Sequence, residues 1–187
     1  MADFFYKNVI IYQSPDEQCS FRKELKKIKK LDGDVIEVGV FQGGTAGIIR
    51  EELPNVPLYL FDTFEGFTEE MHKDDPAYKQ GECCADISFV KELMKDEKDV
   101  YIVKGTFPFT SSIVKDKKFC FAHIDVDIYT PTLKSLEFIY PRMVKGGTII
   151  VHDYPAHPGV KTAVDEWLVG KKVETVQNFS RQLFIYV

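Results

Sequence analysis

The segment DVIEVGVFQGG, residues 34–44, joins a short apolar strand to a glycine-rich turn. A helical pattern over residues 45–52 follows directly, so the segment predicts a strand, a tight turn and a helix in immediate succession. Parallel strands need a crossover connection of this kind, and the connection is usually a helix. The segment therefore predicts an α/β fold.

The same alternation extends along the rest of the chain. Further apolar strands are predicted at 57–62, 100–105, 119–124 and 148–153, and helices at 14–30, 86–95, 130–140 and 160–168. Two terminal strands, 172–177 and 182–187, are separated by a short turn, which is typical of antiparallel pairing. We predict a single α/β domain over residues 1–187, with a mostly parallel seven-stranded sheet, helices on both faces and an antiparallel C-terminal edge.

Local signals fix several boundaries and leave others open. Ser14-Pro15-Asp16-Glu17 has the pattern of a capping box, so it predicts the start of the first long helix, within an N-terminal segment of residues 1–33. Residues 4–13 could form an entry strand or part of a lid. Residues 63–85 predict a functional loop or lid, because long connections without periodicity are often functional. We also expect a turn at 145–147 and a helix cap at Thr130.

Composition excludes some partners. The net charge of −5 argues against nucleic acid as a partner, because nucleic-acid binding normally needs a basic face. No apolar run is long enough to span a bilayer, and the first residues lack the pattern of a signal peptide. None of the four cysteines forms a C-x-x-C pair, so we expect reduced thiols in a cytoplasmic protein without a membrane partner.

Polar residues and glycines end five of the predicted strands. They are Glu37 and Gly39, Asp62, Gly105, Asp125 and Asp127, and His152 and Asp153. The carboxyl ends of parallel strands form the ligand-binding edge of open α/β sheets, so these residues predict one site. If the strand continues past residue 124, Asp125 and Asp127 share a face. Two buried like charges then require a cation, a hydrogen-bonding ligand or a shared proton.

The glycine-rich turn resembles a dinucleotide-binding loop incompletely. Phe41 stands where the G-x-G-x-x-G pattern has its second glycine. The turn could therefore serve packing alone rather than bind a ligand. Asp62 could accept hydrogen bonds from ribose hydroxyls or cap a helix, although the residues after it do not have a helical pattern.

Four blocks together resemble the macrocin O-methyltransferase (TylF-like) family of class I S-adenosylmethionine-dependent methyltransferases. They are EVGVFQGG (37–44), LFDTFEGF (60–67), IDVDIYTPT (124–132) and YPRMVKGGTIIVHDY (140–154). The resemblance covers about residues 34–167. It implies a Rossmann-like class I methyltransferase sandwich and transfer of a methyl group to a sugar hydroxyl on a small molecule. It also leaves self-association as a homo-oligomer open.

The resemblance implies a role for each matching residue. Glu37, Gly39, Gly43 and Gly44 would surround the methionine part of S-adenosylmethionine, and Asp62 would hold its ribose. Gly105 and Asp125 lie at the same predicted edge and are assigned to the cofactor site with them. Asp125, His152 and Asp153 stand where the family binds a divalent metal, usually magnesium. Asp127 stands where the family has a general base, which would take the hydroxyl proton.

Two departures from the family pattern limit what can be carried over. The family usually has two adjacent acids where this chain has His152-Asp153, and an imidazole nitrogen shifts preference from magnesium towards manganese or another transition metal. While a strand continues, His152 and Asp153 point to opposite faces, so ligation and packing are equally open for His152. The chain is also shorter than is typical of the family, so acceptor identity does not carry over.

Three rival functions are consistent with parts of the pattern. A metal-dependent O-methyltransferase of the catechol type would use the same chemistry on an aromatic diol. A non-catalytic interaction module could retain S-adenosylmethionine binding. A nicotinamide-dependent oxidoreductase is disfavoured by the missing glycine at Phe41.

Overall fold

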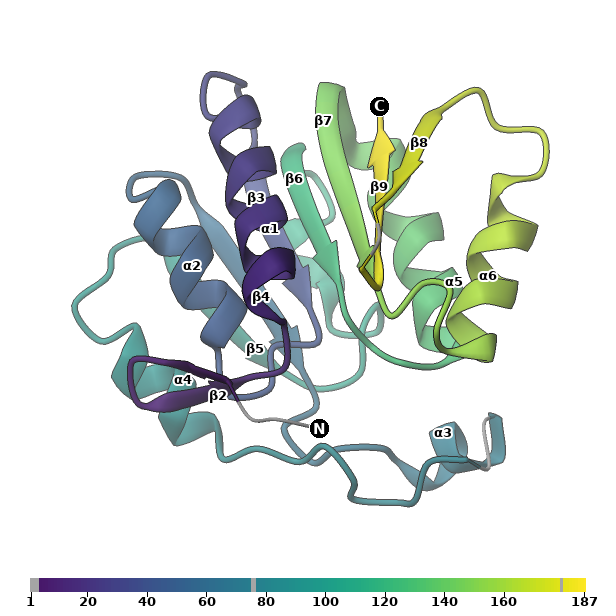
Figure 1. The fold of residues 1–187 in the computed structure, drawn as a ribbon. Coiled ribbons are helices and arrows are strands. Elements are labelled where there is room, and N and C mark those ends of the chain that lie inside the picture. Colours follow the sequence, from purple (N-terminus) through teal and green to yellow (C-terminus); the bar gives the residue numbers. More distant parts are fainter. Residues whose placement is uncertain (1–3, 75–76, 179) are drawn as a thin grey trace.

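A seven-stranded sheet forms the centre of the computed structural model, which describes residues 4–74, 77–178 and 180–187 (Figure 1). The strand order is β5-β4-β3-β6-β7-β9-β8. The strands are β3 Asp34–Val38, β4 Leu58–Asp62, β5 Val100–Lys104, β6 Phe119–Ile124, β7 Met143–His152, β8 Glu174–Gln177 and β9 Gln182–Tyr186. The pairs from β5 to β7 are parallel, and β9 is antiparallel to both β7 and β8. The predicted sheet and its antiparallel C-terminal edge are confirmed.

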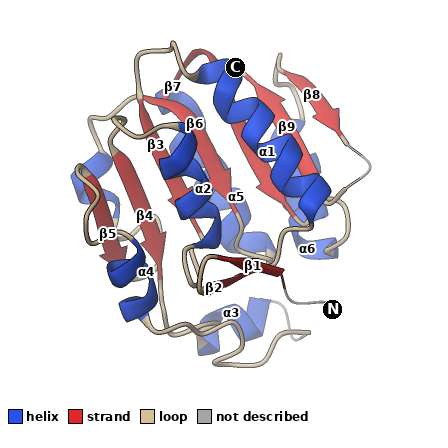
Figure 2. Cartoon of the chain, turned by 60° about the vertical axis from the view of Figure 1, so that its left-hand side comes forward, coloured by secondary structure: helices blue, strands red, loops and turns tan. Residues whose placement is uncertain are grey.

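Helices cover both faces of this sheet (Figure 2). One face carries α1 Pro15–Ile28, α2 Gly44–Glu52 and α4 Ile87–Leu93, and the other carries α5 Tyr129–Ile139 and α6 Pro158–Leu168. Three short helices, α3 Glu69–Asp74, η1 Ser111–Val114 and η2 Tyr140–Arg142, lie in connections. Because side chains alternate along a strand, Val35 joins the core under α1 and α2, whereas Ile36 joins the core under α5 and α6. None of the described helices is long and apolar enough to cross a membrane.

Several predicted boundaries need correction. The turn expected at 145–147 lies inside β7, because the β6–β7 register shifts near Phe119 and the chain continues as a strand through Gly146 at φ +84°. Helix α5 begins at Tyr129 and has Ile128 at its N-cap, so Thr130 is not the capping residue. The capping box at α1 is confirmed, with the Ser14 hydroxyl accepting from the Glu17 amide and the Glu17 carboxylate accepting from the Ser14 amide.

The first described residues form a small hairpin, β1 Phe4–Tyr6 and β2 Val9–Ile11, which packs against α2. Glycines on α2 permit this contact. A Cβ atom on Gly47 would lie 2.2 Å from the Tyr6 ring, and one on Gly44 would lie 2.7 Å from Ile11. The hairpin therefore lies against the N-terminal end of α2, beside the edge where the parallel strands end.

The chain reverses its direction of travel across the sheet between β3 and β6. From β3 it moves outward through β4 to β5, and then returns to place β6 on the other side of β3. At this switch point the turn after β3 and the loop after β6 approach each other closely. Gly39 has φ +88°, and a Cβ atom there would lie 1.7 Å from the backbone oxygen of Asp125. Such a switch point opens a crevice beyond the carboxyl ends of the strands.

Replacing Gly39 by alanine should destabilise the protein strongly. The left-handed φ costs about 1–2 kcal/mol for an L-residue, and the overlap with Asp125 adds a cost of similar size, so we expect a loss of about 3 kcal/mol in urea unfolding. Gly170→Ala is the matched control, because Gly170 has φ +75° but a Cβ atom there would meet no described atom beyond its chain neighbours within 4 Å. An equal loss in both variants would show that the close approach to Asp125 is unimportant.

Candidate active site

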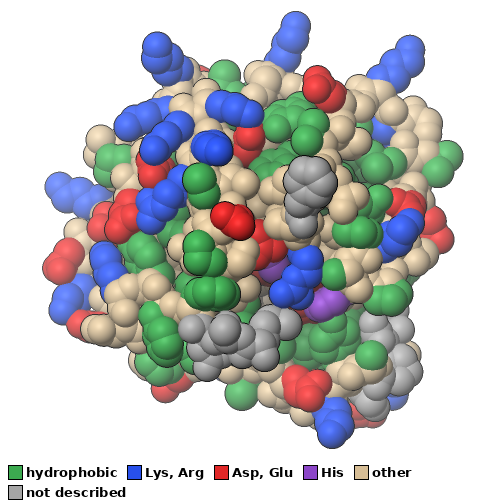
Figure 3. Space-filling model, viewed as in Figure 1, with side chains coloured by type: hydrophobic (Ala, Val, Ile, Leu, Met, Phe, Trp, Pro, Cys, Tyr) green, Lys and Arg blue, Asp and Glu red, His purple; other side chains and the backbone are tan. Residues whose placement is uncertain are grey.

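A cavity of about 480 Å³ lies at the carboxyl ends of the central strands. Its walls come from the N-terminal hairpin, the turn after β3, the ends of β4 and β5, the loops after β6 and β7, and the connection before β9. The space-filling view shows histidine side chains in a hollow in the lower half of the face, beside acidic side chains and bordered by apolar ones (Figure 3). The strand ends that the sequence places at one edge therefore do meet around one cavity.

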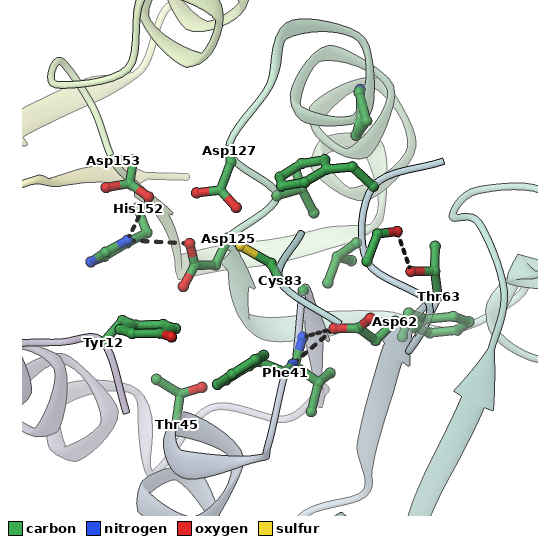
Figure 4. Close-up of a pocket in the computed structure, with 18 of the residues that line it drawn as sticks. Tyr12, Phe41, Thr45, Asp62, Thr63, Cys83, Asp125, Asp127, His152 and Asp153 are labelled. Carbon is green, nitrogen blue, oxygen red and sulfur yellow. Dashed lines mark hydrogen bonds and ion pairs between the residues drawn. The ribbon is translucent and has the colours of Figure 1, made fainter. Parts of the chain in front are cut away.

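Asp62 organises one end of this cavity. Its Oδ2 atom accepts hydrogen bonds from the backbone N–H groups of Val40 (2.7 Å) and Phe41 (2.8 Å), and Oδ1 accepts from Phe64 (2.7 Å) (Figure 4). A carboxylate has about four acceptor positions, so three backbone bonds leave one for another donor. Asp62 thus fixes the glycine-rich turn against β4 and lines the cavity.

Asp125 and Asp127 also line the cavity, and Figure 4 shows Asp127 near Asp153, away from Asp62. The expectation that they share a strand face is wrong in its geometry, because β6 ends at Ile124 and both residues lie in the following loop. Asp127 adopts φ +63°, a backbone region in which aspartate is enriched among non-glycine residues. Burial raises the pKa of Asp127 well above its usual value, and the negative charges of Asp125 and Asp153 raise it further.

His152 and Asp153 converge although a continuous strand would separate them. Strand β7 ends at His152, and Asp153 turns back with φ +61°. As a result, Nδ1 of His152 lies 3.2 Å from Oδ1 of Asp125 and 3.1 Å from Oδ2 of Asp153 (Figure 4). Burial opposes protonation of His152, but the neighbouring carboxylates outweigh it and raise the pKa of the imidazole. For Asp153, burial acts to raise the pKa, but the contact with His152 outweighs it and lowers that pKa.

Residues from both ends of the chain complete this carboxylate cluster. Nη1 of Arg181 lies 3.0 Å from Oδ1 of Asp153. Oε1 of Glu17 lies 3.6 Å from Nε2 of His152 and accepts a hydrogen bond from the backbone N–H of Arg181 at 3.1 Å. Burial acts to raise the pKa of Glu17, but the contacts with His152 and Ser14 outweigh it and lower the pKa to about 2. Glu17 is therefore ionised and faces the imidazole.

His157 and Tyr78 join the site without a clear signal in the sequence. Nδ1 of His157 lies 2.6 Å from the Tyr78 hydroxyl and 3.5 Å from Oδ1 of Asp127. Tyr78 comes from the predicted lid, residues 63–85, of which residues 75 and 76 lie outside the described chain. Its ring packs 4.5 Å from that of Phe67, centroid to centroid. The lid segment thus contributes to the cavity wall next to Asp127.

Two residues assigned to the cofactor lie behind the cavity wall. Glu37 is fully buried, where Oε1 accepts from the Thr45 hydroxyl and lies 2.8 Å from Nδ1 of His123. Burial raises the pKa of Glu37. Gly43 is the N-cap of α2, with φ +88°. The other assigned residues line the cavity directly; they are Gly39, Gly44, Asp62, Gly105, Asp125, Asp127, His152 and Asp153.

Three further residues near the strand ends have defined surroundings. Cys83 lines the cavity at an exposed position, where partial desolvation together with the charges of Asp127 and Asp125 raises its pKa to about 12, so it is a thiol rather than a nucleophilic thiolate. Tyr129 and Tyr154 are not in the wall; their hydroxyls donate to Glu166 and Asp165.

Comparison with known protein families identifies the family to which this chain belongs. The family model described as Macrocin-O-methyltransferase (TylF) matches residues 20–179. The chain belongs to this family. Among curated relatives, demethyldecarbamoylnovobiocin O-methyltransferase of Streptomyces niveus is 27% identical over 152 residues, which are 72% of this chain and 58% of the relative. Mycinamicin III 3''-O-methyltransferase of Micromonospora griseorubida is 26% identical over 153 residues, which are 72% of this chain and 60% of the relative.

Solved structures show the same fold. The O-methyltransferase NovP superposes with a TM-score of 0.76 at 20% identity, covering 90% of this chain and 78% of NovP. The calicheamicin methyltransferase CalS11 superposes with a TM-score of 0.75 at 20% identity, covering 91% of this chain and 78% of CalS11. The TylF-family chain therefore has a Rossmann-like methyltransferase fold, and it spans less than two thirds of the length of the curated relatives that it matches.

Replacing Asp62 by asparagine tests its role in organising the turn. An amide has one acceptor oxygen and would present an NH₂ group to a backbone N–H, so we expect a loss of about 2 kcal/mol in urea unfolding. Asp86→Asn is the control, since Asp86 caps α4 at an exposed position where asparagine caps equally well; its stability should stay within about 0.5 kcal/mol of the parent. Equal stability of both variants would contradict this role of Asp62.

Proposed function

We propose that this chain is an S-adenosylmethionine-dependent O-methyltransferase that acts on a hydroxyl of a sugar or sugar-bearing small molecule. The observation that carries the proposal is one cavity lined both by Asp62, which holds the glycine-rich turn, and by the half-buried carboxylate of Asp127. Membership of the TylF family supports the reaction class. Relatives named as methylating mycinamicin III at a 3'' oxygen and a rhamnosyl tetracenomycin at a 4' oxygen (the latter from Streptomyces olivaceus) support a sugar-bearing acceptor.

The glycine-rich end of the cavity fits S-adenosylmethionine. Asp62 retains one acceptor position towards the cavity, which suits a ribose hydroxyl. Gly39, Gly44 and Gly105 leave the wall without side chains where a cofactor must approach the backbone. Behind this wall, Glu37 accepts a hydrogen bond from Thr45 on α2, and Gly43 is the N-cap of the same helix. When bound there, the cofactor would supply an electrophilic methyl group on a sulfonium.

The carboxylate end fits a divalent metal. Ligand atoms of Asp125, His152 and Asp153 all lie within 4.8 Å of one another. The two ring nitrogens of His152 are buried and have no hydrogen-bond partner among the described residues, which leaves a donor atom available to a cation. These three residues would hold the metal, and the bound metal would lower the pKa of an acceptor hydroxyl.

Asp127 is suited to receive the proton of that hydroxyl. A sugar hydroxyl is a weak nucleophile, so it must lose its proton as its oxygen attacks the methyl carbon. Burial and the neighbouring carboxylates raise the pKa of Asp127, which makes it a stronger base than an exposed aspartate. His157, 3.5 Å from Asp127, and Tyr78 border the space in which the acceptor would lie.

The Asp127→Asn variant should bind S-adenosylmethionine normally but turn over slowly. Loss of a general base typically lowers the rate about 100- to 10,000-fold, so we expect that decrease in kcat with a cofactor Kd within about twofold of the parent. Methyl transfer from labelled cofactor and calorimetry measure the two quantities. Asp116→Asn, at an exposed site remote from the cavity, is the control. An unchanged kcat would remove Asp127 from the reaction.

The reaction class itself is tested by calorimetry and an acceptor panel. Folded protein that fails to bind S-adenosylmethionine would overturn the proposal. Turnover of glycosylated acceptors or nucleotide sugars is the expected result, whereas turnover of catechols alone would overturn the sugar assignment. Cofactor binding without turnover of any acceptor would favour a non-catalytic interaction module.

A further inference from the structure

We propose that Glu17 is a positioning residue that orients His152 as a nitrogen ligand, so that this site prefers a transition-metal dication such as Mn²⁺ or Co²⁺ over Mg²⁺. The inference rests on the metal site of the proposed function and specifies which class of metal that site would bind. It follows from the surroundings of His152, which stands where the family usually has an acid.

The two ring nitrogens of His152 face different groups. Nδ1 lies between Asp125 and Asp153, at 3.2 Å and 3.1 Å from their nearest oxygens, while Nε2 faces Glu17 on the other side. At 3.6 Å, the Glu17 oxygen lies just beyond hydrogen-bond distance of Nε2. Neither carboxylate contact of Nδ1 satisfies the geometry of a hydrogen bond, so the oxygens of Asp125 and Asp153 lie away from the direction in which a ring N–H would point. The two oxygens therefore flank the nitrogen, an arrangement that suits three ligands around one cation.

Glu17 is held in place from both ends of the chain. Its Oε2 atom accepts from the Ser14 amide at 2.8 Å as part of the capping box of α1. Its Oε1 atom accepts from the Arg181 amide at 3.1 Å and lies 3.6 Å from Nε2 of His152. With a side chain only 4% exposed, this carboxylate has little freedom to turn away from the imidazole.

A carboxylate opposite Nε2 determines which ring nitrogen can bind a metal. It favours the N–H at Nε2, which leaves the lone pair on Nδ1, the nitrogen that faces Asp125 and Asp153. Histidines that bind metals commonly have such a carboxylate at their second nitrogen, and it fixes the tautomer and the ring orientation. The capping-box glutamate thus lies next to Nε2, a few tenths of an ångström beyond the hydrogen bond that this arrangement requires.

The donor set selects the class of metal. One imidazole nitrogen and two carboxylate oxygens suit manganese, cobalt or zinc, whereas magnesium prefers an all-oxygen environment with several waters. An acid at position 152 would supply that oxygen environment. The chemistry of His152 therefore favours transition metals, and Glu17 gives the imidazole the required orientation.

Direct metal titration of the purified protein tests the inference. The protein is stripped with a chelator and titrated calorimetrically with MgCl₂, MnCl₂ or CoCl₂, without S-adenosylmethionine or acceptor, and the visible spectrum of the Co²⁺ complex reports nitrogen ligation. We expect Mn²⁺ and Co²⁺ to bind at least about tenfold more tightly than Mg²⁺. Equal or tighter binding of Mg²⁺ would overturn the assigned metal class.

The Glu17→Gln variant tests the positioning role. Glutamine at this position still serves the capping box, so α1 should remain folded. Its NH₂ group can donate to Nε2 and so favour the opposite tautomer, and we expect Co²⁺ affinity to fall about 10- to 100-fold. Glu24→Gln is the matched control, because Glu24 is buried on the same helix but contacts Lys27 and Tyr186. Unchanged Co²⁺ affinity in folded Glu17→Gln would overturn the role of Glu17.

The His152→Asp variant provides an independent readout. It restores the adjacent acids usual in the family, so the preference should move towards Mg²⁺ and the Co²⁺ spectrum should lose its nitrogen signature. A spectrum identical to that of the parent would show that His152 is not a ligand. Because these titrations contain neither cofactor nor acceptor, their failure is distinct from a failure of methyl transfer.

Discussion

Repulsion among clustered carboxylates is the physical constraint at the edge of the sheet that carries the cavity. Asp153 is buried, and Asp125 and Asp127 lie half-buried near it, an arrangement that is costly unless opposite charge is supplied. The imidazole of His152 and the guanidinium of Arg181 offset part of this charge. The remaining excess of negative charge would favour a bound cation, and the charges of Asp125 and Asp153 help to raise the pKa of Asp127.

Backbone strain is concentrated at the same edge. Phe41, Cys83, Asp127 and Asp153 all have positive φ, and all line the cavity. Each of these conformations costs free energy and persists only because surrounding contacts determine it. At Asp153 the contacts are those with His152 and Arg181, so the network that offsets charge also holds the backbone in the conformation that the site needs.

Much of the fold could be predicted because its signals are local. Apolar runs and glycine-rich turns identify the parallel strands, and the Ser14–Glu17 pattern identifies the start of α1. The way in which the site side chains point depends on where β6 and β7 end, and alternation within a strand cannot predict those ends. His152 and Asp153 point towards each other because β7 ends at His152 and the chain turns at Asp153. Contacts such as His157 with Tyr78 join segments far apart in the sequence, and no local pattern indicates them. The burial of Glu37 behind the wall is likewise a result of tertiary packing.

The hydrogen bond from the backbone N–H of Arg181 to the Glu17 carboxylate joins the two ends of the chain, and this affects the order in which parts of the molecule can fold. The hairpin and α1 leave the ribosome well before Arg181 and β9 do. The parallel central strands and their helices can begin to assemble while the chain is still being made, because domains start to fold during synthesis. The cavity, however, lacks one wall until the segment at Arg181 is released, so a nascent chain can be largely folded and still have no complete site.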